Sequence, residues 1–129
     1  MEGQIRVLIV DDVPEVRKAL RWSLETDGGF EVVGEAWDGR EAMRQIEREK
    51  PNAIVLDILM PTMDGYHALP QIRFTSPETR ILVYSIVEDP EEALWARGAD
   101  AVMRKDESMT AVADRLRELC WAVSYFAAN

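Results

Sequence analysis

The 129-residue chain is long enough for one domain, and its 47% of hydrophobic residues can form a buried core. Its formal net charge of −9 argues against nucleic acid as a direct ligand of this domain, because binding to phosphate backbones needs a concentrated basic surface. One cysteine and one histidine exclude an internal disulfide and a structural zinc site, and no apolar run is long enough to cross a membrane. We therefore expect a cytoplasmic protein that forms a single domain over residues 1–129, with its core at about 5–120 and no effector domain in this chain.

Short β-branched runs and amphipathic segments alternate along the chain, with turn residues between them. Pro14 stands where the first turn of a helix tolerates proline, and Asp38 is placed to cap a second helix. In chain order we predict a strand at 5–10, a helix from Pro14 to the glycines at 28–29, a strand at 30–36, a helix through Glu49, a strand at 53–57, a helix at 65–74, a strand at 80–85, a helix at 90–97, a strand at 101–104 and a helix from Ser108 to about Phe126.

Strands that alternate with helices predict an α/β fold, in which a parallel sheet is covered by helices on both faces. Ligands of such folds bind beyond the carboxyl ends of the strands. Charged and polar residues follow four of the predicted strands at that edge. These residues are Asp11 and Asp12 after the first strand, Asp57 at the end of the third, Ser85 at the end of the fourth and Lys105 after the fifth.

Three carboxylates at one sheet edge repel one another, so the site needs a cation or raised carboxyl pKa values. Oxygen ligands of this kind suit Mg²⁺, which takes one or two carboxylates together with a phosphate oxygen. If one carboxylate accepted a phosphoryl group, Mg²⁺ and Lys105 would neutralise the new oxygens and the Ser85 hydroxyl would donate a hydrogen bond to them. The residue set therefore points to phosphoryl transfer onto an aspartate.

Four motifs carry a resemblance to a known family: LIVDD at 8–12, LDILMPTMDG at 56–65, VYS at 83–85 and GADAVMRKD at 98–106. The chain resembles the CheY-like receiver domain of two-component response regulators over roughly residues 5–119. The VVGEAWDG segment at 32–39 and the Lys-Asp ending of the last motif look most like receivers of helix-turn-helix transcription factors. The resemblance implies a flavodoxin-like, three-layer sandwich with a five-stranded parallel sheet of order 2-1-3-4-5.

The resemblance also implies a role for each site residue. Asp57 would be the phosphoacceptor, with Ser85 and Lys105 in contact with the phosphoryl group. The Mg²⁺ ligands would be Asp12, Asp11 (directly or through water), Asp57 and the backbone carbonyl of Leu59. The chain would then be a signalling switch rather than an enzyme, phosphorylated by a sensor histidine kinase or a phosphotransfer protein.

Other functions remain open on sequence grounds. A haloacid-dehalogenase-like phosphatase is disfavoured because Leu59 stands where that class has a second aspartate. A flavodoxin-like electron carrier is disfavoured because Asp11 and Asp12 would repel a phosphate. A receiver-like interaction module that works without phosphate is the alternative, since Val102 replaces the aromatic residue of many receivers and Ile86 stands where many have a small residue.

Two tryptophans suggest an interface. Trp22 falls beside the apolar stripe of the first predicted helix and Trp121 beside that of the last, so we expect an exposed apolar patch and a possible homodimer through these helices. His67 is expected to be a surface residue rather than a phosphocarrier. The chain is either a single-domain regulator or a receiver separated from a larger protein.

Overall fold

The computed structural model describes residues 3–60, 65–86 and 90–128, with side chains described up to residue 121. The predicted α/β alternation is confirmed. The strands are β1 (Ile5–Val10), β2 (Phe30–Ala36), β3 (Ala53–Leu56), β4 (Arg80–Ser85) and β5 (Ala101–Arg104). The helices are α1 (Pro14–Asp27), α2 (Gly39–Glu49), α3 (Gly65–Thr75), α4 (Glu91–Arg97) and α5 (Met109–Ala128).

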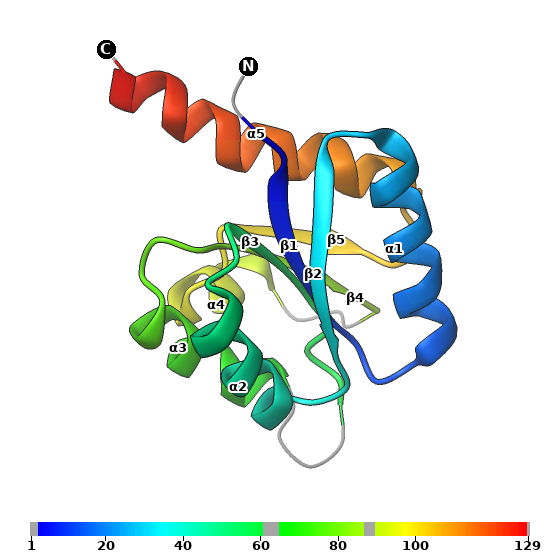
Figure 1. Cartoon of the computed structure of the whole chain (residues 1–129). Helices are drawn as coiled ribbons and strands as arrows, with labels where there is room; N and C mark the ends of the chain where they lie inside the picture. The colour runs from blue at the N-terminus through cyan, green and yellow to red at the C-terminus, as the bar shows by residue number, and fades with distance from the viewer. Residues whose placement is uncertain (1–2, 61–64, 87–89, 129) are drawn as a thin grey trace.

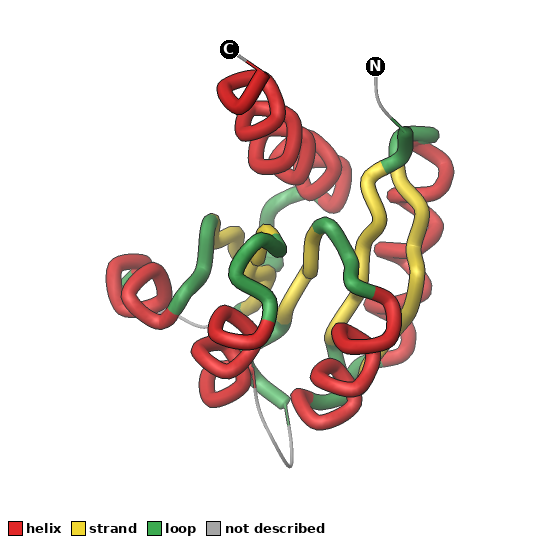
Figure 2. Tube along the Cα trace, turned by 60° about the vertical axis from the view of Figure 1, so that its left-hand side comes forward, coloured by secondary structure: helices red, strands yellow, loops and turns green. Residues whose placement is uncertain are grey.

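The five strands form one parallel sheet in the order β2-β1-β3-β4-β5, as the resemblance implied. Helices α1 and α5 cover one face of this sheet, and α2, α3 and α4 cover the other (Figure 1). Figure 2 shows the same arrangement from a second direction, with helices on both sides of the strands. The molecule is therefore a three-layer sandwich.

Alternation along each strand builds a separate core on each face of the sheet. In β1, Val7 and Ile9 pack with α1 and α5, whereas Leu8 and Val10 pack with α2, α3 and α4. All four side chains are fully buried, and each contributes about 1.5–3 kcal/mol of hydrophobic stabilisation. This burial on both faces explains why the strands are continuous apolar runs rather than alternating ones.

Local signals set the helix ends. The Asp38 carboxylate accepts a hydrogen bond from the Glu41 amide over 2.9 Å and so caps α2. Helix α1 begins at Pro14 and ends at Asp27, and it is followed by Gly28, whose φ of +94° favours glycine. Among the described residues, none of the helices combines the length and apolar character needed to cross a membrane.

The register of the sheet brings the strand ends together. Val10 of β1 pairs with Leu56 of β3, and Leu56 pairs with Val83 of β4. Strand β3 ends one residue earlier than predicted, so Asp57 lies directly after it, but the Asp57 amide still donates to the Val10 carbonyl over 2.9 Å. The residues that follow β1, β3, β4 and β5 therefore meet at one edge of the sheet.

Candidate functional site

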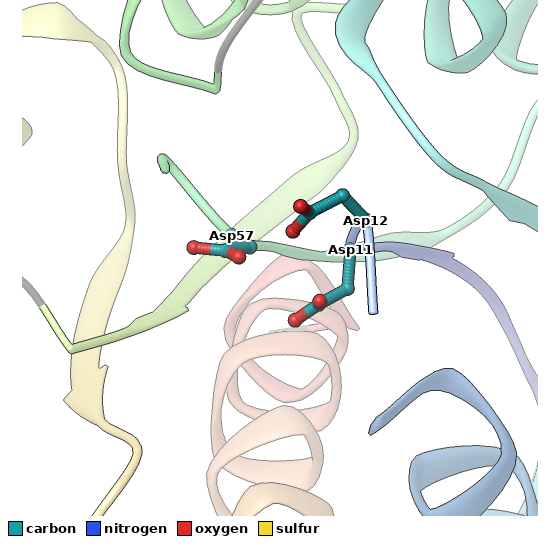
Figure 3. Close-up of side chains that lie close together, drawn as sticks. All are labelled: Asp11, Asp12 and Asp57. Carbon is teal, nitrogen blue, oxygen red and sulfur yellow. The ribbon is translucent and has the colours of Figure 1, made fainter. Parts of the chain in front are cut away.

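Three carboxylates meet at the carboxyl edge of β1 and β3. One carboxylate oxygen from each of Asp11, Asp12 and Asp57 lies within 4.8 Å of the others. Figure 3 shows the three side chains gathered at this edge. Asp11 and Asp57 are only 1% and 4% exposed, so water screens their charges poorly, and Asp12 is more accessible. The cluster needs a compensating cation.

Lys105 supplies one positive charge to this cluster. Its Nζ lies 2.6 Å from Asp11 Oδ2 and 3.3 Å from Asp57 Oδ2. The Lys105 amide donates to the Ser85 carbonyl, which continues the pairing of β4 with β5 and directs the side chain to the site. Although burial acts to lower the pKa of Lys105, the hydrogen bond and charge of Asp11 and the charge of Asp57 raise it above its ordinary value.

Asp57 is held by donors on both of its oxygens. Oδ1 accepts hydrogen bonds from the Ser85 hydroxyl at 2.9 Å and from the Leu59 amide at 3.0 Å, while Oδ2 faces Lys105. Burial raises the pKa of Asp57, and the nearby charge of Asp11 adds to this effect. The hydrogen bonds and Lys105 oppose the shift without cancelling it. These donors fix the orientation of the carboxylate.

The donor set fits a divalent cation that prefers oxygen. Three carboxylates face one lysine, which leaves an excess of negative charge at a mostly buried edge. Mg²⁺ is bound in this way, through one or two carboxylates and several waters. The Asp11 carboxylate is also held in place, because its Oδ1 accepts a hydrogen bond from the Val13 amide at 2.9 Å.

Comparison with known proteins decides the family. The family model described as "Response regulator receiver domain" matches residues 7–117. The chain belongs to this family. Receiver domains are the phosphorylation-responsive part of response regulators, and they typically bind Mg²⁺ in an acidic pocket such as this one.

Among the relatives is the transcriptional regulatory protein YhcZ of Bacillus subtilis, 40% identical over 79% of this chain and 49% of YhcZ. The response regulator VraR of Staphylococcus aureus is 38% identical over 95% of this chain and 59% of VraR. The solved receiver domain of NarL from Mycobacterium tuberculosis superimposes with a TM-score of 0.86 at 30% identity, covering 92% of this chain and 98% of that one. The resemblance to receivers of transcription factors is thus confirmed, and the chain spans about half the length of the curated relatives named here.

The structure brings together the side chains that the sequence placed at the receiver site: Asp11, Asp12, Asp57, Ser85 and Lys105. Leu59 contributes its amide to Asp57, a contact that the sequence analysis did not anticipate. The expected metal contact of the Leu59 carbonyl stays a prediction, as do the individual roles of the other residues.

The two departures from the receiver pattern lie close to this edge. Val102 in β5 is half-buried and packs against the core under α2, α3 and α4. The partly buried Tyr66 packs against the same core. Ile86, which follows Ser85, is 67% exposed. Residues 61–64 of the LDILMPTMDG motif and residues 87–89 after Ile86 lie outside the described residues.

The expected tryptophan patch forms only in part. Trp22 on α1 is 70% exposed, whereas Trp121 on α5 is partly buried against the core of α1 and α5. The Arg117 guanidinium lies 5.8 Å from the centre of the Trp121 ring, which covers it further. A homodimer through these helices stays a prediction. His67 is exposed, as expected of a surface residue.

Two residues that support the site were not found from the sequence. A Cβ on Gly65 would lie 2.2 Å from the Asp57 carbonyl oxygen, so only glycine allows α3 to begin this close to the backbone of Asp57. Arg17 on α1 donates to the Asp11 carbonyl over 2.6 Å. The Asp-Gly pair at 64–65 was a sequence signal for Gly65. Arg17 gave no such signal, because in the sequence it is an ordinary charged residue of a helix.

Proposed function

We propose that this receiver domain is a cytoplasmic signalling switch in which Asp57 accepts a phosphoryl group. One observation carries the proposal: a buried carboxylate, oriented by Ser85 and the Leu59 amide, lies beside Lys105 and two further carboxylates. An aspartate nucleophile, a hydroxyl donor, a cation and an acidic pocket are the components that phosphoryl transfer to protein requires.

The phosphoryl donor is a phosphohistidine on a sensor histidine kinase or on a phosphotransfer protein. During transfer, the P–N bond of the donor breaks as a P–O bond forms to a carboxylate oxygen of Asp57, and the imidazole leaves with the electron pair. Lys105 Nζ lies 3.3 Å from Asp57 Oδ2, so its positive charge is placed to neutralise the phosphoryl oxygens. The Ser85 hydroxyl, now bonded to Asp57 Oδ1, is placed to donate to the phosphoryl group.

The residues that would hold Mg²⁺ are Asp11, Asp12 and Asp57, with the Leu59 carbonyl as a further ligand. A bound Mg²⁺ supplies positive charge against the phosphoryl oxygens and so makes attack by an anionic carboxylate feasible. Asp11 also keeps Lys105 in place through their 2.6 Å ion pair. On this proposal the chain acts as a phosphoacceptor and not as an enzyme with a separate substrate.

The phosphorylated domain then changes its contacts with a partner or with a second copy. The exposed Trp22 side chain on α1 supports self-association at that surface, because a large apolar side chain in water favours a covered state.

The test is the intact mass of the protein after incubation with acetyl phosphate and MgCl₂. We expect the mass of one phosphoryl group to be added, and we expect the addition to be lost when EDTA replaces MgCl₂. Asp12→Asn is the matched variant: it should retain the fold but require more MgCl₂ for the same extent of modification. Equal modification with and without the metal would contradict the assigned Mg²⁺ site.

A further inference from the structure

Arg17, near the start of α1, contacts both the turn that precedes its helix and a residue of β2. Its Nη1 donates to the backbone carbonyl of Asp11 over 2.6 Å, and its Nε donates to Glu35 Oε1 on β2 over 3.1 Å. The side chain is only 15% exposed. The guanidinium therefore bridges the end of β1 to β2 from its position on α1.

This bridge acts on the peptide that carries Asp12. The Asp11 amide donates to the Ala36 carbonyl over 3.0 Å, and the Asp11 carbonyl accepts from Arg17, so hydrogen bonds hold the chain on both sides of Asp11. The Arg17 amide also closes the first turn of α1 by donating to the Val13 carbonyl. The orientation of the Asp11–Asp12 peptide determines where the Asp12 carboxylate points.

Glu35 keeps the Arg17 side chain in this position. It accepts from Arg17 on one oxygen and from Arg21 Nε on the other, the latter over 2.6 Å. Partial burial acts to raise the pKa of Glu35, but the hydrogen bonds and charges of Arg21 and Arg17 lower it below its ordinary value. Glu35 therefore stays ionised at neutral pH and anchors both arginines.

We propose that Arg17 is a positioning residue for the Mg²⁺ site, which holds the β1–α1 turn so that Asp11 and Asp12 face the ion together. This inference rests on the proposed function, because it concerns the same metal site. Arg17 does not touch the ion. It acts through the Asp11 carbonyl, as outer contacts of metal ligands commonly do.

Charge and position make opposite predictions for this residue. Arg17 carries a positive charge near a cation site, so its removal would strengthen Mg²⁺ binding if long-range repulsion were its only effect. Removal would weaken Mg²⁺ binding if the hydrogen bond to Asp11 orders the ligands. The direction of the change in Mg²⁺ affinity therefore distinguishes charge repulsion from ordering of the ligands.

The chain offers a matched control. Arg21 lies one helical turn beyond Arg17, pairs with the same Glu35 and carries the same charge, but its guanidinium donates to Glu35 and Glu25 instead of to Asp11. Arg21→Gln therefore removes a cation and an ion pair with Glu35 while leaving the Asp11 contact in place. Arg17→Lys keeps the charge but removes the planar guanidinium, which donates to both Glu35 and the Asp11 carbonyl.

The experiment is a titration of the ¹⁵N-labelled protein with MgCl₂, followed by NMR. We expect Arg17→Gln to weaken Mg²⁺ binding about tenfold and Arg17→Lys to weaken it less, with Arg21→Gln within about twofold of the wild type. In the metal-free protein, exchange of the Val13 amide, which donates to Asp11, should be faster in Arg17→Gln and unchanged in Arg21→Gln. This readout does not depend on phosphorylation.

Mg²⁺ binding by folded Arg17→Gln that equals or exceeds that of the wild type would overturn the inference and leave the proposed function standing. If Arg17→Gln does not fold, Arg17→Lys decides in the same way, since its charge is unchanged. A wild-type protein whose Asp11 and Asp12 amides do not respond to MgCl₂ would overturn the metal site itself, and the inference with it.

Discussion

The Ser85 hydroxyl donates a hydrogen bond to Asp57 Oδ1 over 2.9 Å, and both side chains are buried. The bond joins the end of β4 to the residue that follows β3. A change in the charge or bonding of Asp57 therefore alters a hydrogen bond of the last residue of β4 directly. In the proposed switch, Ser85 would exchange its carboxylate acceptor for a phosphoryl oxygen, which displaces the end of β4.

Removal of the Ser85 hydroxyl should slow modification of Asp57. In Ser85→Ala the phosphoryl group loses one donor, and we expect the rate of phosphorylation by acetyl phosphate to fall at least about tenfold. Ser85→Thr keeps a hydroxyl and should recover much of the rate. Both rates are measured by intact mass on samples quenched at successive times at a fixed MgCl₂ concentration. Equal rates for Ser85→Ala and the wild type would remove Ser85 from the mechanism.

The two buried carboxylates should differ in their effect on the stability of the metal-free protein. Asp57→Asn relieves repulsion from Asp11 while Lys105 keeps its 2.6 Å pair with Asp11, so we expect the free energy of unfolding at neutral pH to rise by about 1 kcal/mol. Asp11→Asn breaks that ion pair and should be destabilising. Urea denaturation in EDTA measures both variants.

The pH dependence of this stability follows from the raised pKa of Asp57. The folded protein holds the Asp57 proton more tightly than the unfolded chain, whose carboxyl has its ordinary pKa of 3.8. The stabilising contribution of Asp57 is therefore present below 3.8 and is lost as pH rises through the higher folded-state pKa. The advantage of Asp57→Asn should grow over that same window. An advantage that shrinks as pH rises would show that the pKa shift has the opposite sign.

Gly65→Ala should disturb the backbone around Asp57. The new Cβ would lie 2.2 Å from the Asp57 carbonyl oxygen and 2.6 Å from the Ile58 Cα, and neither is a flexible side chain. We expect a loss of about 1–3 kcal/mol in the free energy of unfolding, together with slower phosphorylation. Gly29→Ala is the control, because its nearest neighbour would be the Arg117 side chain at 3.7 Å. Equal stability of the two variants would contradict the close packing of α3 on Asp57.

Trp22 should contribute to self-association of the activated protein. We expect a beryllofluoride adduct at Asp57 to increase the weight-average mass in light scattering, and we expect Trp22→Ala to reduce that increase. Trp95→Ala is the matched control, since Trp95 is also exposed, at 49%, but lies on α4. A mass that does not depend on beryllofluoride at any concentration would exclude a dimer controlled by phosphorylation.

The sequence predicted the sheet and most of the candidate site for a physical reason. In a parallel sheet all strands end at the same edge, so Asp57 and Lys105 meet although 48 residues separate them. Arg17 could not be predicted, because its contact with Asp11 depends on the exact path of the β1–α1 turn. Trp121 was expected in solvent from its place beside an apolar stripe, but the position of α5 and the Arg117 guanidinium partly cover it.

The central claim is that Asp57 itself receives the phosphoryl group, and its most direct test is to locate the modification. Borohydride reduces an aspartyl phosphate to homoserine, so the acetyl phosphate-treated protein is reduced, digested and sequenced by mass spectrometry. We expect homoserine at residue 57 alone, and none in Asp57→Asn. Homoserine at Asp11 or Asp12, or a phosphoryl group retained on His67, would contradict the assignment.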